Sequence, residues 1–383
     1  MFCRNRPLIG PSPEKRTSSS KVCPGARPLF LGGKYKIMIR FGELVYAPLE
    51  RTARHGGKGT EMNIIQVSGT GGPEQLLCKE IVTPEPKAGE VLVRNEAVGV
   101  NFIDIYHRSG IYPLALPFIP GLEAAGTVAV ANSLSPEFQV GDRVCYAMTM
   151  GAYAQYTCVP VGNLVRMPAW MDSRLGAASL LQGMTAHFLS GSTYPLQEKD
   201  TALVHAAAGG VGRLLVQMAR ARGARVIATV SSLEKANLAR EAGASEVIFY
   251  EEQDFLAQVR YLTGGKGVQV VYDSVGRNTW QKSLECLAPR GMLVLYGQSS
   301  GLVPPIDPQE LAQRGSLFVT RPTLRHYLLS REELDHRSGE LFQWIREGKI
   351  QVKIDKTFPL EQAPDAHRYL QARKTMGKVL LLP

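Results

Sequence analysis

A glycine-rich segment, Ala207–Gly212, is the first feature of this 383-residue chain that points to chemistry. It follows the short apolar run Leu203–Ala206 and precedes a helical pattern with one apolar face. Glycines let the backbone approach a pyrophosphate without a Cβ in the way, and a helix N-terminus offers unpaired N–H groups and partial positive charge. The strand–loop–helix context predicts a dinucleotide-binding loop, in which Ala207 replaces the first glycine of the usual pattern. The expected cofactor contacts are Gly209, Gly210, Val211 and Gly212.

The strand expected over Ala224–Val230 indicates which nicotinamide cofactor the loop serves. Sites specific for NAD usually place an acidic residue at the end of this strand, where it accepts from the ribose 2′-hydroxyl. Here Ser231 and Ser232 follow the strand, with no acid before Glu234. Ser231, Ser232 and Lys235 could bind a 2′-phosphate, which favours NADPH. The alternative for Lys235 is a solvated position on a helix face.

These residues need a scaffold, and from about residue 184 the pattern alternates between strands and helices. Six strands are expected to begin at Thr201, Ala224, Glu246, Val268, Met292 and Ser316. The intervening helices are expected over Val211–Arg222, Leu233–Glu241, Phe255–Leu262 and Thr279–Leu287. This alternation predicts an α/β fold with a doubly wound parallel sheet, whose ligands lie at the carboxyl ends of the strands. The residues closing the fifth strand are therefore candidate cofactor contacts: Tyr296, Gly297, Gln298 and Ser299.

The chain on either side of this alternation has a different pattern. Residues 62–165 form short β-type runs separated by turns, with one helix expected over Phe102–Arg108. After residue 323 we expect a helix (Arg331–Arg346), a strand, a second helix (Leu360–Ala372) and a final apolar run. We expect a mostly β catalytic domain over 62–183, completed by 323–383, and a cofactor domain over 184–322. Residues 1–61 have no sustained period and are expected to be a disordered basic extension.

Charge and composition exclude several classes of protein. The first 61 residues hold a net charge of +8 of the chain's +10, so the remainder is close to neutral and nucleic acid is not expected as its main partner. No apolar stretch approaches the roughly 18 residues of a membrane span, so we expect a soluble protein. None of the six cysteines forms a Cys-x-x-Cys pair, which argues against a disulfide scaffold or a zinc ribbon.

Three further motifs resemble a known family. They are Asn101–Tyr112, Pro120–Gly126 and Tyr272–Gly276, and with the glycine-rich loop their order resembles the medium-chain dehydrogenase/reductase superfamily. The resemblance is specifically to its zinc-independent quinone oxidoreductase (ζ-crystallin-like) branch, and it runs from about Met62 to Pro383. It implies a Rossmann domain inserted in a GroES-like catalytic domain, an NADPH:quinone oxidoreductase activity and a homodimer. The cytoplasmic location that we expect comes instead from the scattered cysteines, which favour free thiols in a reducing cytosol.

The same resemblance indicates that no metal is used. Zinc alcohol dehydrogenases of the superfamily have a cysteine near the position of Asn101 and a histidine where this chain has Leu122. Leucine cannot bind a metal, and catalytic zinc usually has three protein ligands. Without a Lewis acid, an electron-poor quinone is the favoured substrate. By resemblance Asn101, Tyr106 and Tyr112 line the nicotinamide and quinone pocket, with Tyr106 as an orienting group or proton donor.

The resemblance also supplies the remaining candidate contacts with the cofactor. Tyr250 is placed near the adenosine and Ser274 after the fourth strand, and Asp104 is as readily structural as functional. The other candidates are Phe102, Ile103, Ile105, Arg321 and Arg373.

Two other functions remain open. An NADPH-dependent reductase of enal or enone double bonds would use the same cofactor geometry and would need an oxyanion donor such as Tyr106. A low-turnover structural protein that binds NADPH and RNA would use the basic N-terminal residues.

Overall fold

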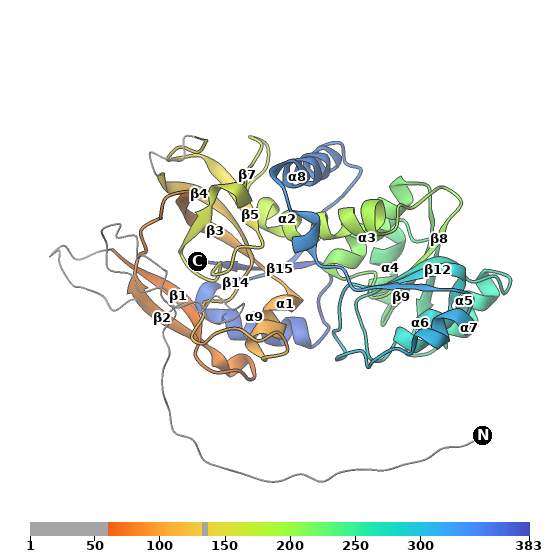
Figure 1. Cartoon of the computed structure of the whole chain (residues 1–383). Helices are drawn as coiled ribbons and strands as arrows, with labels where there is room; N and C mark the ends of the chain where they lie inside the picture. Colours follow the sequence, from red (N-terminus) through yellow and green to blue (C-terminus); the bar gives the residue numbers. More distant parts are fainter. Residues whose placement is uncertain (1–59, 132–136) are drawn as a thin grey trace, which may run out of the picture. The chain divides into compact units, whose positions relative to one another are not determined.

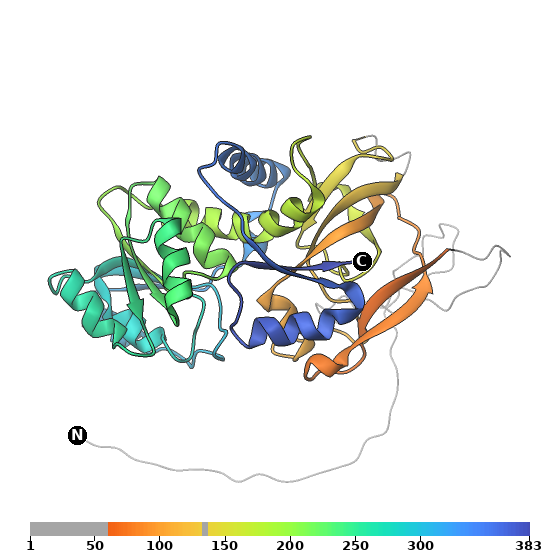
Figure 2. The same ribbon diagram turned by 180° about the vertical axis from the view of Figure 1, so that it is seen from behind.

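The computed structural model describes residues 60–131 and 137–383, which form two large sheets and a separate hairpin (Figures 1 and 2). The hairpin pairs β1 (Glu61–Val67) with β2 (Leu76–Val82). The predicted disordered extension, residues 1–61, lies outside the described residues apart from its last two. No helix in the described ranges is both long enough and apolar enough to cross a membrane.

The first large sheet has seven strands in the order β14-β15-β3-β4-β5-β7, with β6 also paired to β3. The strands are β3 (Glu90–Val100), β4 (Glu123–Ala131), β5 (Arg143–Ala147), β6 (Tyr156–Pro160), β7 (Leu164–Arg166), β14 (Ile354–Pro359) and β15 (Lys378–Leu382). The last strand of the chain thus pairs with β3 in antiparallel register, which returns the C-terminus to the N-terminal sheet. This arrangement brings Lys378 beside residues that lie more than 250 positions earlier.

The second sheet has six parallel strands in the order β10-β9-β8-β11-β12-β13. They are β8 (Thr201–Val204), β9 (Arg225–Val230), β10 (Glu246–Phe249), β11 (Val268–Asp273), β12 (Leu287–Leu295) and β13 (Phe318–Thr320). The predicted fold class is confirmed, a Rossmann-type sheet with a GroES-like domain. The strand order reverses between β8 and β11, and ligands of such sheets bind at the carboxyl ends beside this switch point.

Nine α-helices accompany these sheets in the described residues. They are α1 (Phe102–Arg108), α2 (Ser173–Phe188), α3 (Gly210–Ala221), α4 (Leu233–Ala242), α5 (Phe255–Leu262), α6 (Trp280–Glu285), α7 (Pro308–Gln313), α8 (Arg331–Arg346) and α9 (Ala363–Gln371). Short 3-10 turns lie at Pro73–Gln75, Val161–Asn163, Leu324–Tyr327 and Leu360–Gln362, and a π turn at Leu189–Thr193 follows α2. The bounds predicted for α1, α5 and α8 are confirmed.

Helix α2 was not predicted, although it connects the two sheets (Figure 1). Twelve of its sixteen residues are buried, because it packs against β3, β4 and β5 on one side and α3 and α8 on the other. A helix that is buried nearly all round has no apolar stripe with a period of 3.6, so its sequence lacks the usual signal. The predicted domain limit between residues 183 and 184 falls inside α2, and the division into domains stays a prediction.

Candidate functional site

A single cavity of about 690 Å³ runs along the carboxyl ends of β8, β9, β11 and β12 and reaches α1 and α2. The sequence-predicted residues that line it are Asn101, Phe102, Ile103, Tyr106, Tyr112, Gly209, Gly210, Val211, Gly212, Ser231, Lys235, Tyr250, Ser274, Tyr296, Gly297, Ser299, Arg321 and Arg373. Residues from widely separated stretches of the chain therefore share one wall, at the place where a doubly wound sheet binds ligands.

The glycine-rich loop forms the middle of this wall. Gly209 is the N-cap of α3 and provides no side-chain cap, so the first N–H groups of the helix face the cavity without a side-chain acceptor. A Cβ at Gly212 would lie 2.3 Å from the carbonyl oxygen of Ala206, so the close approach of helix and strand requires glycine there. Ala206 takes the strained backbone conformation of the turn, with φ of 51°. An uncapped helix N-terminus of this kind fits a pyrophosphate.

A cationic cluster lies beyond the end of β9. The Lys235 ammonium donates to Ser231 Oγ at 3.1 Å and to the backbone oxygen of Arg373 at 2.6 Å. Partial burial lowers the pKa of Lys235 from its ordinary value. Ser232 does not line the cavity, because its hydroxyl caps α4 by accepting from the backbone N–H of Lys235. Ser231, Lys235 and Arg373 can together receive a phosphate that projects from the ribose.

Two tyrosines, Tyr106 and Tyr112, pack edge to face at the opposite end of the cavity, with ring centroids 5.2 Å apart and ring planes at 64°. Tyr106 Oη accepts from the backbone N–H of Gln298 at 3.0 Å, and burial raises the pKa of Tyr106 to about 12. Tyr112 Oη accepts from the Arg321 guanidinium at 2.8 Å. Each hydroxyl already receives one hydrogen bond and keeps its own proton to donate. The end that holds these two tyrosines and Arg321 is called the tyrosine end below.

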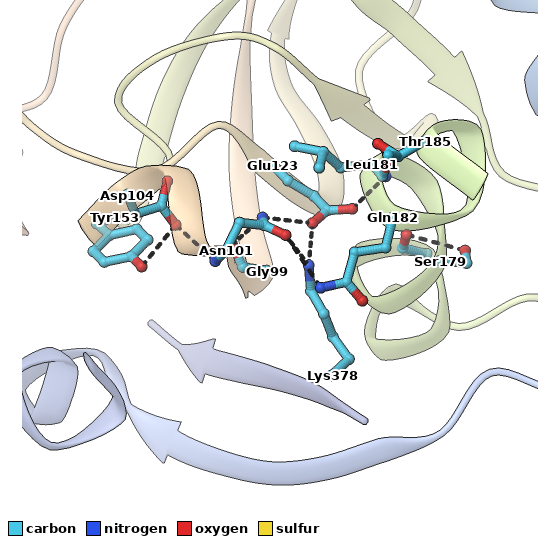
Figure 3. A network of polar contacts seen from close by, with 11 residues as sticks. Gly99, Asn101, Asp104, Glu123, Tyr153, Ser179, Leu181, Gln182, Thr185 and Lys378 are labelled. Carbon is cyan, nitrogen blue, oxygen red and sulfur yellow. Dashed lines mark hydrogen bonds and ion pairs between the residues drawn. The ribbon is translucent and has the colours of Figure 1, made fainter. Parts of the chain in front are cut away.

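Asn101 lies beside this end, and its side-chain amide is fully engaged within the protein (Figure 3). Its Oδ1 accepts from Lys378 Nζ at 2.8 Å and from Gln182 Nε2 at 3.3 Å. Its Nδ2 donates to Glu123 Oε2 at 3.0 Å and to the backbone oxygen of Gly99 at 3.2 Å. Two donors and two acceptor sites are all that an asparagine amide offers. Asn101 therefore has no hydrogen-bonding capacity left for a substrate.

A buried ion pair holds this amide in place. Lys378 from β15 and Glu123 from β4 are both almost fully buried and in direct contact. Glu123 also accepts from the backbone N–H of Leu181 at 2.6 Å, which ties α2 to the sheet. Figure 3 shows Lys378 reaching up from β15 toward Asn101 and Glu123. The predicted site omitted Lys378 and Glu123 as well as Gln182, because nothing in the local sequence indicates that β15 and α2 meet β4 at this point.

A second polar chain extends from the other side of Asn101. Asp104 Oδ2 accepts from the backbone N–H of Asn101 at 2.9 Å and from the Tyr153 hydroxyl at 3.0 Å. Tyr153 Oη lies 2.9 Å from His367 Nε2, whose other nitrogen lies 3.1 Å from an Arg108 nitrogen. Burial raises the pKa of Asp104 to about 7 and lowers the pKa of His367 to about 3. Asp104 is fully buried and does not line the cavity, so it fixes the start of α1 rather than touching a ligand.

Two other predicted contacts, Ile105 and Gln298, also lie outside the cavity wall. Ile105 is buried in the interior, and Gln298 contributes its backbone N–H to Tyr106. Each is the immediate sequence neighbour of a residue that does line the cavity, so these two predictions were wrong by one position along the chain. The wall also includes residues that were not predicted, among them Met148, Gln182, Thr185 and Leu324. Only the tertiary packing of α2, of the residue after β5 and of the segment after β13 brings these side chains to the cavity.

Two buried histidines have hydrogen-bonding rather than ligand roles. His205 lies between Thr229 Oγ1 at 2.9 Å and Ser283 Oγ at 3.0 Å, and burial lowers its pKa. His187 lies in a group with His336 and Glu340 whose potential metal-ligand atoms are within 4.8 Å of one another. An Arg337 nitrogen lies 3.2 Å from His187 Nδ1, which fixes that ring nitrogen as the acceptor and directs the other N–H to Glu340. This pattern favours an Arg–His–Glu hydrogen-bond chain.

Comparisons with known families match both halves of the described fold. Residues 87–169 match the family described as "Alcohol dehydrogenase GroES-like domain". Residues 242–381 match the family described as "Zinc-binding dehydrogenase". The two matches cover parts of both sheets.

Individual relatives extend over nearly the whole described region. The chain is 46% identical over 321 residues to a quinone oxidoreductase of Pseudomonas aeruginosa, covering 83% of this chain and 99% of the relative. It is 45% identical over 321 residues to a 2-haloacrylate reductase of a Burkholderia species, covering 82% and 96%. A crystal structure of Escherichia coli quinone oxidoreductase complexed with NADPH superposes with a TM-score of 0.82 at 44% identity, covering 84% of this chain and 100% of that one.

Proposed function

The chain belongs to the quinone oxidoreductase branch of the medium-chain dehydrogenase/reductase superfamily, and from this premise we propose that it reduces quinones with NADPH without a metal ion. One observation carries the proposal. A continuous cavity wall joins an uncapped helix N-terminus, a Ser–Lys pair beyond β9 and a pair of tyrosines in edge-to-face contact. These three features match, in order, a pyrophosphate, a ribose 2′-phosphate and a flat redox ring.

The residues present fit NADPH along its length. The N-terminus of α3 would hold the pyrophosphate, since its first N–H groups have no side-chain cap and Gly212 lets the helix pack closely against Ala206. Ser231, Lys235 and Arg373 would hold the 2′-phosphate by charge-assisted hydrogen bonds. The nicotinamide would lie toward the tyrosine end, where the cofactor supplies a hydride when it is bound.

A quinone suits this site because it accepts electrons without a Lewis acid. Leu122 occupies the position at which zinc-dependent members of the superfamily have a histidine, and it is buried among apolar side chains. The protein then has to orient the two rings and exclude water. Tyr106 stays protonated across the physiological range because its pKa is about 12. Its hydroxyl can donate a hydrogen bond to a quinone oxygen, while solvent supplies the proton.

We assign Asn101 a positioning role, which revises the catalytic role predicted for it. All four of its amide hydrogen bonds are made inside the protein. It connects the buried Glu123–Lys378 pair to Gln182 on the cavity wall. A Cβ on Gly210 would lie only 2.0 Å from Gln182 Oε1, so the side chain of Gln182 packs directly against the start of α3. The network around Asn101 therefore contacts the phosphate-binding helix.

A quinone panel tests the proposed function directly. Absorbance would report the oxidation of NADPH or NADH in the presence of benzoquinones, naphthoquinones and a matched enal. We expect quinone-dependent oxidation of NADPH with a kcat/KM at least about tenfold above that for NADH, from the charged contacts to the 2′-phosphate. Turnover of enals with none of the quinones would reverse the assignment in favour of a double-bond reductase.

The alternative of a structural protein that binds RNA rests on the basic residues 1–61, which lie outside the described residues apart from the last two. Comparing the full chain with a chain starting at Met62 for salt-dependent RNA retention would test it. Tight RNA binding by both chains, together with no oxidation of NADPH, would favour this alternative over the enzyme.

We further infer a homodimer and a cytoplasmic location. Strand β13 is an edge of the six-strand sheet, and its Phe318 is 55% exposed. An exposed edge strand can pair with its symmetry mate in a two-fold dimer. The four cysteines that the structure describes are free thiols, which is compatible with a reducing compartment. Sedimentation of the wild type tests the dimer: a monomeric wild type would contradict it.

A further inference from the structure

The tyrosine end of the cavity presents hydrogen-bond donors and a positive charge. Tyr106 and Tyr112 each accept one hydrogen bond from the protein, so each retains its own O–H to donate. All four hydrogen-bonding positions of the Asn101 amide are occupied by protein groups, so this side chain offers no acceptor to a ligand. A ligand at this end therefore meets donors, and it is best matched by a group rich in acceptor oxygens.

Arg321 supplies the charge. It follows β13 directly and lines the cavity. Its guanidinium donates to the backbone oxygen of Leu295 at 2.8 Å and to Tyr112 Oη at 2.8 Å. A guanidinium has five N–H groups, so these two bonds set its orientation and leave others to donate. Two fixed bonds reduce the side-chain entropy that a ligand would otherwise have to overcome.

No carboxylate of the described cavity wall neutralises this charge. Asp254 is the one acidic side chain among the described lining residues, and it pairs with Lys282 at 3.0 Å. Glu123 lies behind the wall and pairs with Lys378. Arg321 makes no ion pair with any described residue. An anion beside the nicotinamide would therefore meet a positive charge without a competing acid.

We propose that Arg321 and Tyr112 form a carboxylate receptor, through which the enzyme also reduces the C=C bond of α,β-unsaturated carboxylates. The inference rests on the proposed function, because it uses the same NADPH site. A planar guanidinium recognises a carboxylate through parallel hydrogen bonds, which a neutral quinone cannot reproduce. The relative that is a 2-haloacrylate reductase, 45% identical to this chain, is compatible with an acceptor of this class.

The reaction balances with the reductant already assigned. NADPH gives a hydride to the β-carbon and leaves as NADP⁺, and the C=C π electrons move toward the α-carbon and the carboxylate. The receptor stabilises the extra negative charge that develops on the carboxylate oxygens. A proton from solvent then adds to the α-carbon, giving the saturated carboxylate. Each turnover consumes one NADPH and one proton.

A matched pair of acceptors tests the receptor. 2-Chloroacrylate and its methyl ester would be compared in the wild type, Arg321→Met and Arg325→Met, with 1,4-benzoquinone as the reference acceptor. Arg325 is a cation nearby in the sequence but does not line the cavity, so its variant is the control. Binding of 2-chloropropanoate, a saturated product, would be measured by calorimetry with NADP⁺ present, which gives a readout independent of turnover.

We expect Arg321→Met to lower kcat/KM for 2-chloroacrylate by about tenfold or more, the effect of losing a hydrogen bond to a charged group. The values for the ester and for benzoquinone should fall by a smaller factor than the value for the acid, because neither neutral acceptor uses the guanidinium charge. In Arg321→Met the binding of 2-chloropropanoate should weaken by a factor similar to the loss of kcat/KM for 2-chloroacrylate. Arg325→Met should match the wild type in both measurements. Equal losses of kcat/KM for 2-chloroacrylate and its methyl ester would overturn the receptor, as would a wild type that binds neither 2-chloroacrylate nor 2-chloropropanoate. In both cases reduction of benzoquinone would still support the proposed function. Arg321-dependent binding of the saturated acid without any quinone reduction would instead contradict the proposed function and leave the receptor supported.

Discussion

The two ends of the cavity differ in how much of their polar chemistry is already used. Behind the tyrosine end, Asn101, Glu123 and Lys378 are buried and satisfy one another's polar groups. At the end of β9, Lys235 contacts a hydroxyl and a backbone carbonyl, and no carboxylate pairs with it in the described residues. The first cluster, called the closed cluster here, consists of Asn101, Glu123, Gln182 and Lys378. The second, the open cluster, consists of Ser231, Lys235 and Arg373.

The difference teaches how to separate residues that build a site from residues that bind a ligand. A buried charge with every partner supplied by the protein stabilises one arrangement of strands and helices. A cation whose partners are neutral retains its attraction for an anion. We therefore expect changes in the closed cluster to affect folding, and changes in the open cluster to affect cofactor binding.

The largest effect is expected for Lys378→Met. The substitution leaves Glu123 as an unpaired buried carboxylate, which should lower the free energy of unfolding by about 3–5 kcal/mol. Urea denaturation measures the loss. Adding Glu123→Gln to Lys378→Met removes the stranded charge and should recover part of it. If Lys378→Met alone were as stable as the wild type, the closed cluster would not stabilise the fold and the comparison would fail.

The next effect is expected for Lys235→Ala in the open cluster. Loss of a charged hydrogen bond to the 2′-phosphate should raise KM for NADPH about tenfold to a hundredfold. KM for NADH should change less than about twofold, because NADH lacks that phosphate. Lys266→Ala, an exposed lysine away from the cavity, is the control. An equal rise for both cofactors would remove Lys235 from this role.

A pH-dependent effect is expected for Asp104, which borders the closed cluster. Its pKa is about 7 in the folded chain against an ordinary value of 3.8, so the folded state holds a proton that the unfolded state releases. The stability from this group is present below about pH 4 and is lost as the pH rises through 7. Asp104→Asn should therefore gain stability relative to the wild type between pH 5 and 8, by on the order of 2 kcal/mol.

Urea unfolding at pH 5 and at pH 8 measures this gain, with the surface variant Asp142→Asn as the control. Burial is what separates the two positions, because Asp142 is partly exposed and pairs with Arg166. A stability difference between Asp104→Asn and the wild type that did not change with pH would show that Asp104 is ionised throughout.

The smallest effect is expected for Tyr106→Phe at the tyrosine end. The variant loses one donor to the quinone oxygen and leaves the Gln298 N–H without its acceptor. A neutral hydrogen bond of this kind corresponds to about 1 kcal/mol, or roughly a fivefold loss of kcat with KM for NADPH unchanged. A loss of a thousandfold would instead make Tyr106 an obligatory acid.

Most of the predicted site residues lie on the cavity wall, whereas the polar network behind that wall was not predicted. The glycine-rich loop, Ser231 and Lys235 were found because their signals are local, a turn or a strand end that carries its own chemistry. Ser232 was misplaced because a hydroxyl at that position serves equally well as a helix cap, and only the geometry distinguishes the two uses.

Lys378 and Gln182 had no comparable signal. Lys378 lies in the last strand, and its partner Glu123 is 255 positions away, so no spacing rule connects them. Helix α2 carries Gln182 and is buried nearly all round, which removes the periodic pattern that marks a surface helix. Long-range strand pairing places Lys378 and long-range helix packing places Gln182, and no short window of a single sequence encodes either contact.

The most direct test of the central claim is stopped-flow reduction of 1,4-benzoquinone by NADPH before and after exhaustive chelation, with the metal content of the same samples measured. We predict an unchanged rate and far less than one zinc per chain, because Leu122 stands where a metal ligand would be needed. A rate that falls on chelation and returns with added zinc would contradict metal-free hydride transfer in this cavity.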